Sequence, residues 1–229
     1  MCAARTAVIL PEAAPDYDRS CRRCPRLASF LDAVKRENPA YWCLPVPPFG
    51  AIGAPLLIVG LAPGMHGANA TGRAFTGDYA GLLLYETLHD FGFASAPVAT
   101  SREDGLALAG CRISNAVKCL PPGNKPLPVE VATCSRYLAV DLAALPAGGA
   151  ILALGRIAHE AVLRIAGAAL RTHPFAHGAR HAVAPGALAL FDSYHCSRYN
   201  TNTGRLTRAM FRAVFRDVAA YLGRPAPPA

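Results

Sequence analysis

The sequence predicts an α/β fold, a three-layer α/β/α sandwich around a central, mainly parallel sheet of four strands. Four short runs with the character of buried strands predict the strands, because strands that are buried on both faces are rich in apolar residues. Segments with helical spacing of apolar residues separate these runs, and this alternation is typical of a parallel sheet covered by helices. With 229 residues, 52% of them hydrophobic, the chain is long enough for one core, so we expect a single domain over residues 1–222.

The elements are expected in the following order. A helix should follow Cys24, because apolar residues recur at helical spacing from Pro25 and proline is tolerated in a first helical turn. The strands are expected at residues 55–60, 112–117, 150–154 and 187–191, and further helices near 79–91, 129–144, 156–167 and from about 205 onwards. After Leu222 the sequence GRPAPPA predicts a disordered tail over residues 223–229.

The charge balance gives a weak indication of the partner. Lysine and arginine outnumber the acidic residues 23 to 15, and the pI is about 9.3. This balance favours contact with a polyanion, although it does not distinguish nucleic acid from a membrane surface or from simple solubility. No apolar stretch is long enough to cross a bilayer, so we expect no membrane association. One face of the last predicted helix carries four arginines: Arg205, Arg208, Arg212 and Arg216. This face can contact phosphates, or it can be an ordinary solvated face.

The cysteines point to a metal site. The apolar run in the N-terminal segment MCAARTAVILPEAAPD is too short and too poorly flanked for a secretory signal, so we expect the chain in the reducing cytoplasm. Eight cysteines there are better explained by metal ligation than by disulfides. Two pairs of cysteines stand out, the C-x-x-C pair Cys21 and Cys24 and the more widely spaced pair Cys119 and Cys134. Together they suit a tetrahedral zinc ion or a four-iron cluster. The alternative is that the second pair consists of ordinary buried cysteines.

The loop after the first strand is rich in glycine. Ligands of open parallel sheets bind outside the carboxyl ends of the strands, so such loops are candidate sites. Glycine lets a backbone approach a ligand closely. Asp78 stands just before a helix, where it can be the N-cap, a catalytic carboxylate, or both. The residues of this loop that we expect to contact a ligand are Gly60, Ala62, Pro63, Gly64 and Phe75.

Polar side chains also follow two of the other strands. Asn115 and Asn124 each offer a donor and an acceptor, which reading the edge of a base requires, although a strand-end hydrogen bond or a turn explains them equally well. After the last strand, His195 and Arg198 stand among hydroxyls and amides. A histidine there can stabilise negative charge or position a phosphate, whereas a lone histidine is often structural. Three polar loops at one edge of a sheet favour a ligand site.

These motifs resemble those of the uracil-DNA glycosylase superfamily, and within it the type 5 enzymes called UdgB, over essentially the whole chain. Type 4 enzymes share the cysteines, but their first loop typically carries an acidic residue where this chain has Leu61, so type 5 fits better. The resemblance rests on several motifs in order: CRRCPRL at 21–27, GLAPG at 60–64, HGAN at 66–69, TGR at 71–73, FTGD at 75–78, the segment 116–126, and SYH at 193–195 running to Asn200 and Thr201.

The resemblance implies a DNA repair enzyme that flips a deaminated base out of duplex DNA and hydrolyses its glycosidic bond. It implies excision of uracil and, more broadly, of hypoxanthine and xanthine. Related enzymes often have alanine where this chain has Gly64, and this departure from the pattern leaves the size of the base pocket open. We expect a monomer that meets DNA in the nucleoid. The resemblance also implies a structural four-iron, four-sulfur cluster on Cys21, Cys24, Cys119 and Cys134.

The expected roles follow from the charges that develop when a base leaves its sugar. Asp78 should orient water or stabilise the oxocarbenium ion, and His195 should act on the leaving base or an adjacent phosphate. Asn124 and, with a less fixed role in type 5, Asn115 should contact the base. Phe75 can stack on the flipped base or fill the core. No lysine stands out as a Schiff-base nucleophile, which predicts a monofunctional enzyme.

Three competing hypotheses remain at this point. A type 4, uracil-specific glycosylase would share the cysteine ligands. A non-catalytic DNA-binding module with a structural metal site would use the glycine loops only to grip phosphates. An electron carrier is disfavoured, because the cysteines lack the compact run of a ferredoxin.

Overall fold

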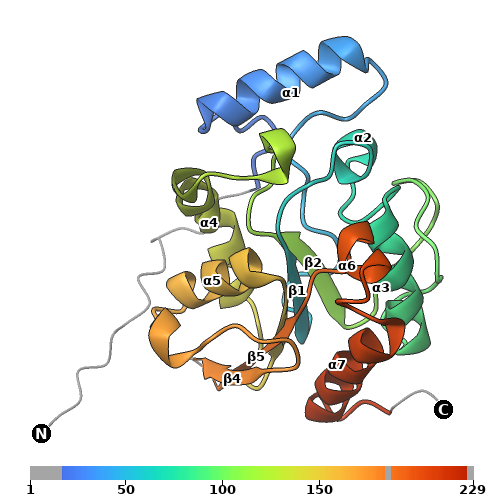
Figure 1. The fold of residues 1–229 in the computed structure, drawn as a ribbon, viewed down its shortest axis with the longest axis vertical. Helices are drawn as coiled ribbons and strands as arrows, with labels where there is room; N and C mark the ends of the chain where they lie inside the picture. The colour runs from blue at the N-terminus through green and yellow to red at the C-terminus, as the bar shows by residue number, and fades with distance from the viewer. Residues whose placement is uncertain (1–16, 184–186, 226–229) are drawn as a thin grey trace, which may run out of the picture.

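The computed structural model describes residues 17–183 and 187–225, and a five-stranded sheet forms its centre. The strand order is β2-β1-β3-β5-β4 (Figure 1). Neighbouring strands are parallel except at one edge, where β4 pairs antiparallel with β5. The predicted mainly parallel α/β fold is confirmed, and each of the four predicted strands agrees to within two residues. The strands are β1 (Leu56–Gly60), β2 (Cys111–Asn115), β3 (Ala150–Leu154), β4 (Arg180–Val183) and β5 (Leu188–Ser193).

The predicted strand count of four was wrong, because the edge strand β4 lacks a continuous apolar run. Its first three residues are exposed or half-buried, and only Val183 is buried. Apolar runs identify strands that are covered on both faces, whereas an edge strand that faces solvent carries polar side chains. The polar residues Arg180 and His181 are therefore the reason why the sequence pattern did not predict the fifth strand.

Helices cover both faces of the sheet (Figure 1). One layer contains α3 (Tyr79–Asp90) and α7 (Arg208–Tyr221), and the opposite layer contains α4 (Pro128–Ala143) and α5 (Arg156–Ile165). These helices and α1 (Pro25–Glu37) confirm the five predicted helices. The sequence pattern missed the short elements α2 (Ala68–Thr71), α6 (Arg198–Asn202) and two single 3₁₀ turns, η1 (Pro122–Asn124) and η2 (Leu170–Thr172). No described helix is long and apolar enough to span a membrane.

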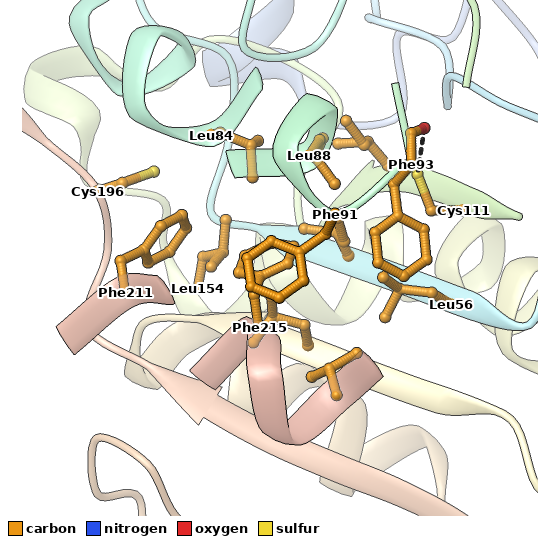
Figure 2. Packing of buried hydrophobic residues seen from close by; sticks show 14 of the residues in the cluster. Leu56, Leu84, Leu88, Phe91, Phe93, Cys111, Leu154, Cys196, Phe211 and Phe215 are labelled. Atoms are coloured by element: carbon orange, nitrogen blue, oxygen red, sulfur yellow. Dashed lines mark hydrogen bonds between the residues drawn. The ribbon is translucent and has the colours of Figure 1, made fainter. Parts of the chain in front are cut away.

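Side chains of the strands alternate between the two helical layers. On β1, Leu56 and Ile58 belong to the apolar cluster with α3 and α7, whereas Leu57 and Val59 belong to the cluster with α4 and α5. This is the period of two expected for a pleated strand that is buried on both faces. Figure 2 shows the first cluster, in which the helices pack on the sheet through Leu84, Leu88, Phe211 and Phe215. The two clusters hold the carboxyl ends of the strands in fixed positions.

Part of the arginine face of α7 is used inside the fold. Arg208 pairs with Glu86, and Arg212 pairs with Asp90, so that both arginines join α7 to α3. Each of these charges already has an acidic partner. The expectation that the whole face can meet phosphates is therefore corrected for these two residues.

The predicted tail contains an anchored residue near its start. Arg224 donates hydrogen bonds to the carbonyl oxygens of Ala109 and Gly92, and its guanidinium lies 4.2 Å from the centre of the Phe93 ring. The expectation of disorder from residue 223 is thus corrected for this residue, whereas residues 226–229 lie outside the described part of the chain. The N-terminal segment that was interpreted as lacking a secretory signal, residues 1–16, also lies outside it, and the single domain over residues 1–222 stays a prediction.

Candidate active site

The carboxyl ends of β1, β2 and β5 open into one cavity of about 440 Å³. Its walls come from the loop after β1, the start of α3, the end of β2, and the loop between β5 and α6. The structure therefore brings the three polar loops together, as their position after the strands predicts. The predicted site residues that line this cavity are Ala62, Gly64, Phe75, Asp78, Asn115, Asn124, His195 and Arg198.

Two predicted residues lie behind the lining instead of in it. Gly60 is the last residue of β1, and a Cβ atom there would come within 2.4 Å of Asn115 Oδ1 and 2.8 Å of Phe75 Cζ. Pro63 is buried. Gly60 thus contributes by leaving room for two side chains of the lining.

Asp78 is both the N-cap of α3 and a lining residue. Its Oδ1 atom accepts a hydrogen bond from the Gly81 N–H at 2.9 Å. Its Oδ2 atom faces the glycine loop, where a Cβ on Gly67 would lie 2.5 Å from it and a Cβ on Gly64 3.6 Å. Burial raises the pKa of Asp78, and the N–H groups of Gly81 and Ala80 oppose that rise. The two interpretations made from the sequence are compatible, because each uses a different oxygen.

His195 lies between the cavity and the interior. Its ring stacks on the Phe75 ring at 5.9 Å between centroids and an interplanar angle of 27°. Removal of water from the ring lowers the pKa of His195 to about 4, so the imidazole is neutral near pH 7. Asn200 donates a hydrogen bond from Nδ2 to the His195 carbonyl oxygen at 2.8 Å and so fixes the loop. A neutral imidazole in this place can donate a hydrogen bond without adding a charge.

The two candidate asparagines differ in depth. Asn115 is 4% exposed, and its Oδ1 atom is one of the buried side-chain atoms that lack a hydrogen-bond partner within the described residues. Asn124 is exposed at the mouth of the cavity and has a φ of +57° in the loop after β2. A buried acceptor without a partner costs about 1–3 kcal/mol, so a ligand that brings a donor would relieve it. The geometry favours Asn115 over Asn124 for contacts deep in the cavity.

The mouth of the cavity carries positive charge. Arg198 is exposed at the start of α6, and its guanidinium lies 5.2 Å from the centre of the Tyr79 ring. Tyr79 was missed from the sequence, although it directly follows Asp78. Leu61 also lines the cavity, although the sequence singled it out only for comparison with type 4 enzymes. The other lining residues that were missed are small and carry no signal of their own: Ala68, Ala80 and Ser197.

A second, smaller cavity lies beside α1 and α4, and all four predicted metal ligands line it. Cys21 and Cys24 precede α1, Cys119 lies in the loop after β2, and Cys134 lies on α4; none is in a disulfide. Burial and the neighbouring thiols raise the pKa of Cys119 to about 12, and burial also raises the pKa of Cys134. Such thiols ionise at neutral pH only when a cation compensates them. The set therefore fits a metal group that binds four thiolates.

The comparisons with known proteins agree on one family. Residues 47–219 match the family model described as the Uracil DNA glycosylase superfamily. A type-5 uracil-DNA glycosylase of Thermus thermophilus is 46% identical over 209 residues, which cover 89% of this chain and 94% of the relative. A type-5 uracil-DNA glycosylase of Pyrobaculum aerophilum is 43% identical over 208 residues, which cover 89% of this chain and 90% of the relative.

The similarity to type 4 enzymes covers less of the chain. A type-4 uracil-DNA glycosylase of Archaeoglobus fulgidus is 36% identical over 147 residues, which cover 64% of this chain and 60% of the relative. The type 5 relatives are thus matched at higher identity and over more of their length, in agreement with the preference drawn from Leu61.

Proposed function

The chain belongs to the uracil-DNA glycosylase superfamily, and on this premise we propose that it is a type 5 enzyme that hydrolyses the N-glycosyl bond of uracil in DNA. The observation that carries the proposal is the convergence of Asp78, Asn115 and His195 on one cavity at the carboxyl edge of the sheet. Duplex DNA is the partner, and the target base leaves the helix to enter the cavity.

The two charges of the reaction have complementary groups in the cavity. When the base departs with the bonding electrons, positive charge develops on the sugar and negative charge on the base. The Asp78 carboxylate acts next to the sugar, where it stabilises the oxocarbenium ion and orients the attacking water. The neutral His195 ring donates a hydrogen bond toward the negative charge of the leaving base.

Binding of the base falls to Asn115 and Phe75. Uracil presents one ring N–H between two carbonyl groups, and the unpartnered Oδ1 atom of Asn115 is an acceptor for that N–H. One face of the Phe75 ring already stacks on His195, so its edge and other face are what remain for the flipped base. Asn124 contacts the nucleotide at the cavity mouth.

Hypoxanthine and xanthine are proposed as further substrates. The cavity of about 440 Å³ is within the range of small-molecule sites, and Gly64 lines it. A Cβ on this residue would make only ordinary contact, 3.6 Å from Asp78 Oδ2. Alanine would therefore fit, and the glycine leaves additional space beside Asp78 for a larger purine.

The enzyme is proposed to be monofunctional and to leave an abasic site. A Schiff-base mechanism needs a lysine amine at the sugar. No lysine is among the described residues that line the cavity. Lys118 is buried elsewhere, where its Nζ atom donates to the Asn115 carbonyl oxygen at 2.7 Å and also to Ser114 Oγ.

A four-iron, four-sulfur cluster on Cys21, Cys24, Cys119 and Cys134 is proposed as the metal group. A single zinc ion, with Zn–S bonds near 2.3 Å, would draw its sulfurs to about 3.8 Å of one another. Among the described residues, the cysteines form no group in which three sulfurs lie within 4.8 Å of one another. Wider spacing supports a cluster, in which each thiolate binds a different iron. Its role is structural, because it would join three segments: the residues just before α1, helix α4, and the loop after β2 that carries Asn124.

The remaining expectations concern the surroundings of the enzyme. Arg198 at the cavity mouth is proposed to contact a DNA phosphate, because it is exposed and has no acidic partner among the described residues. We propose a monomer that acts on chromosomal DNA in the cytoplasm.

Alkaline cleavage of damaged duplexes tests the proposed function. Purified, cluster-loaded protein is incubated with duplex oligonucleotides that carry uracil, hypoxanthine or xanthine, and each product is split into samples with and without alkali. Strand breaks only after alkali are expected for a monofunctional glycosylase. Excision of all three bases is expected for type 5, and excision of uracil alone would indicate the type 4 specificity.

Folded protein that binds these duplexes but cleaves none of them would overturn the proposal in favour of a non-catalytic DNA-binding module. The metal group is tested on the same sample. Broad absorption near 400 nm with four iron atoms per chain is expected, whereas a colourless protein that contains zinc would contradict the cluster.

A further inference from the structure

A second group of metal-binding side chains lies away from both sites described above. His159 of α5 and Asp192 of β5 are 1% and 0% exposed, and His181 of the edge strand β4 is half-buried. One ligand atom from each residue lies within 4.8 Å of the other two. None of the three lines the active-site cavity or the cysteine cavity.

The hydrogen bonds of His159 leave one position to be filled. Its Nε2 atom lies 2.9 Å from the carbonyl oxygen of His173, which can only accept, so Nε2 carries a proton. In the neutral ring Nδ1 is then a bare acceptor, and it lies 2.8 Å from Asp192 Oδ1, another acceptor. Two lone pairs at this distance repel each other unless a cation lies between them or close to both. That cation is either an additional proton or a metal ion.

We propose that His159 Nδ1, His181 Nε2 and a carboxylate oxygen of Asp192 bind a single divalent transition-metal ion of the zinc class. Two imidazoles and one carboxylate are a ligand set that zinc accepts. His181 Nε2 lies 3.1 Å from Asp192 Oδ2, so the second imidazole faces the same carboxylate. The 2.8 Å and 3.1 Å distances lie close to the roughly 3.3 Å spacing of tetrahedral ligands with 2.0–2.1 Å bonds, and all three ligand atoms lie within 4.8 Å of one another.

The surroundings resemble those of known metal sites in two respects. A histidine that binds a metal usually donates its other ring N–H to a carbonyl or a carboxylate, and His159 does so to His173. The site also has an access path, because His181 retains 11% side-chain exposure on the edge strand whereas Asp192 has none. Three protein ligands leave a fourth position for water or an anion.

The expected effect of the metal is mechanical. The three ligands come from α5, β4 and β5, so the ion would fasten the antiparallel edge strand to the sheet and to the helix behind it. Asp192 precedes His195 by three residues on the same segment. The site would thereby stabilise the strand that leads into the active-site loop, and it would not contact DNA. The proposal of this metal site does not depend on the proposed glycosylase activity.

Zinc binding tests the proposal on cluster-loaded protein. The protein is treated with a chelator under conditions that keep the absorption near 400 nm, titrated with Zn²⁺ alone, separated from free metal and analysed for zinc and iron. One zinc ion per chain is expected in addition to unchanged iron. The affinity should fall as the pH falls, because protons compete for the two imidazoles.

Two variants and a matched control locate the ion. His181→Gln and Asp192→Asn should each weaken zinc binding by more than about 100-fold, since altering even residues that only support a metal ligand weakens binding by 10–100-fold. His89→Gln removes a surface histidine on α3 and should bind zinc as the unaltered protein does. His181→Gln alters a partly exposed edge position, so circular dichroism and cluster absorption should stay unchanged.

Either of two results would overturn the proposal. If the unaltered protein takes up no zinc at micromolar concentrations, a proton fills the position on His159. If His181→Gln and His89→Gln bind zinc equally, the ion lies elsewhere. If the two variants bind zinc equally, a Co²⁺ titration shows whether the ion lies at the cysteines. Cobalt bound to cysteine adds intense sulfur-to-cobalt absorption, whereas cobalt bound to two imidazoles and a carboxylate does not.

Discussion

The Asn115 side chain lies so close to Gly60 that a Cβ atom on residue 60 would stand 2.4 Å from Asn115 Oδ1. The two residues are paired in register at the carboxyl ends of β2 and β1. The same Cβ would lie 2.8 Å from Phe75 Cζ. Glycine at position 60 is therefore the condition for placing both the buried amide and the aromatic ring at the cavity floor.

Gly60→Ala should reduce uracil excision strongly. The methyl group must displace Asn115 or Phe75, and a displacement of about 1 Å in a site can cost about 100-fold in rate. Single-turnover excision of uracil from duplex DNA measures the effect. If Asn115 is the displaced group, Asn115→Ala and the double variant should be almost equally slow, because the second change removes nothing further. Strictly additive losses would contradict this coupling.

Gly64→Ala should change specificity more than folding. The added methyl group meets only Asp78 Oδ2 at 3.6 Å, which is ordinary contact, and it occupies space in the cavity beside Asp78. We expect excision of hypoxanthine and xanthine to fall by about 10-fold relative to uracil, because a methyl-sized change in a pocket discriminates by about 1–3 kcal/mol. The measurement is the ratio of kcat/KM values for the three bases. An unchanged ratio would remove Gly64 from the determinants of pocket size.

Asp78→Asn separates the two roles of this residue. An asparagine keeps an oxygen for the Gly81 N–H, and asparagine is as good an N-cap as aspartate. Excision should fall by about 10²–10³-fold, because the charge beside the developing cation is lost. Thermal unfolding should be almost unchanged, whereas Asp78→Ala should also lose about 1 kcal/mol of stability with the cap. DNA binding should persist in both variants. Normal turnover by Asp78→Asn would exclude the carboxylate from the mechanism.

Acid should inactivate the enzyme by protonating Asp78. Burial raises the pKa of Asp78, so the carboxylate is protonated at a higher pH than an ordinary aspartate. The pKa of His195 is lowered to about 4, so its ring is already neutral well below pH 7. The excision rate should therefore fall in acid, and the fall should set in at a higher pH than an ordinary aspartate would give. Cluster absorption at each pH verifies folding, and residual activity of Asp78→Asn with the same acid dependence as the unaltered enzyme would contradict this assignment.

The sequence was sufficient for those parts of the fold and site that depend on local pattern. The strands β1 and β3 are continuous apolar runs, β5 begins with four apolar residues, and β2 alternates apolar with polar residues. Asp78 and His195 stand in loops after β1 and β5, so parallel topology alone brings them to one edge. β4 was missed because it is a short edge strand of which only the last residue is buried.

Other features depend on distances between residues that are remote in sequence. The greater depth of Asn115 relative to Asn124 follows from the register of β2 with β1 and from the position of Asn124 in η1, which has no buried residue. The group around His159 joins residues from α5, β4 and β5, and each of its histidines taken alone fits an ordinary helix or strand. No spacing rule predicts either relation.

Arg198 and Arg212 should differ in their effect on DNA binding. Arg198 is exposed at the cavity mouth and rests on Tyr79, whereas Arg212 is paired with Asp90 between two helices. Arg198→Gln should weaken binding and reduce the slope of log affinity against log salt by about 1, as expected for the loss of one phosphate contact. Arg212→Gln should leave that slope unchanged, although it loses an interhelical ion pair. Fluorescence anisotropy with a uracil-containing duplex measures both, in an Asp78→Asn background that prevents turnover. Equal reductions of the slope would indicate that the α7 face meets the DNA backbone after all, since loss of an internal ion pair releases no counterions from DNA.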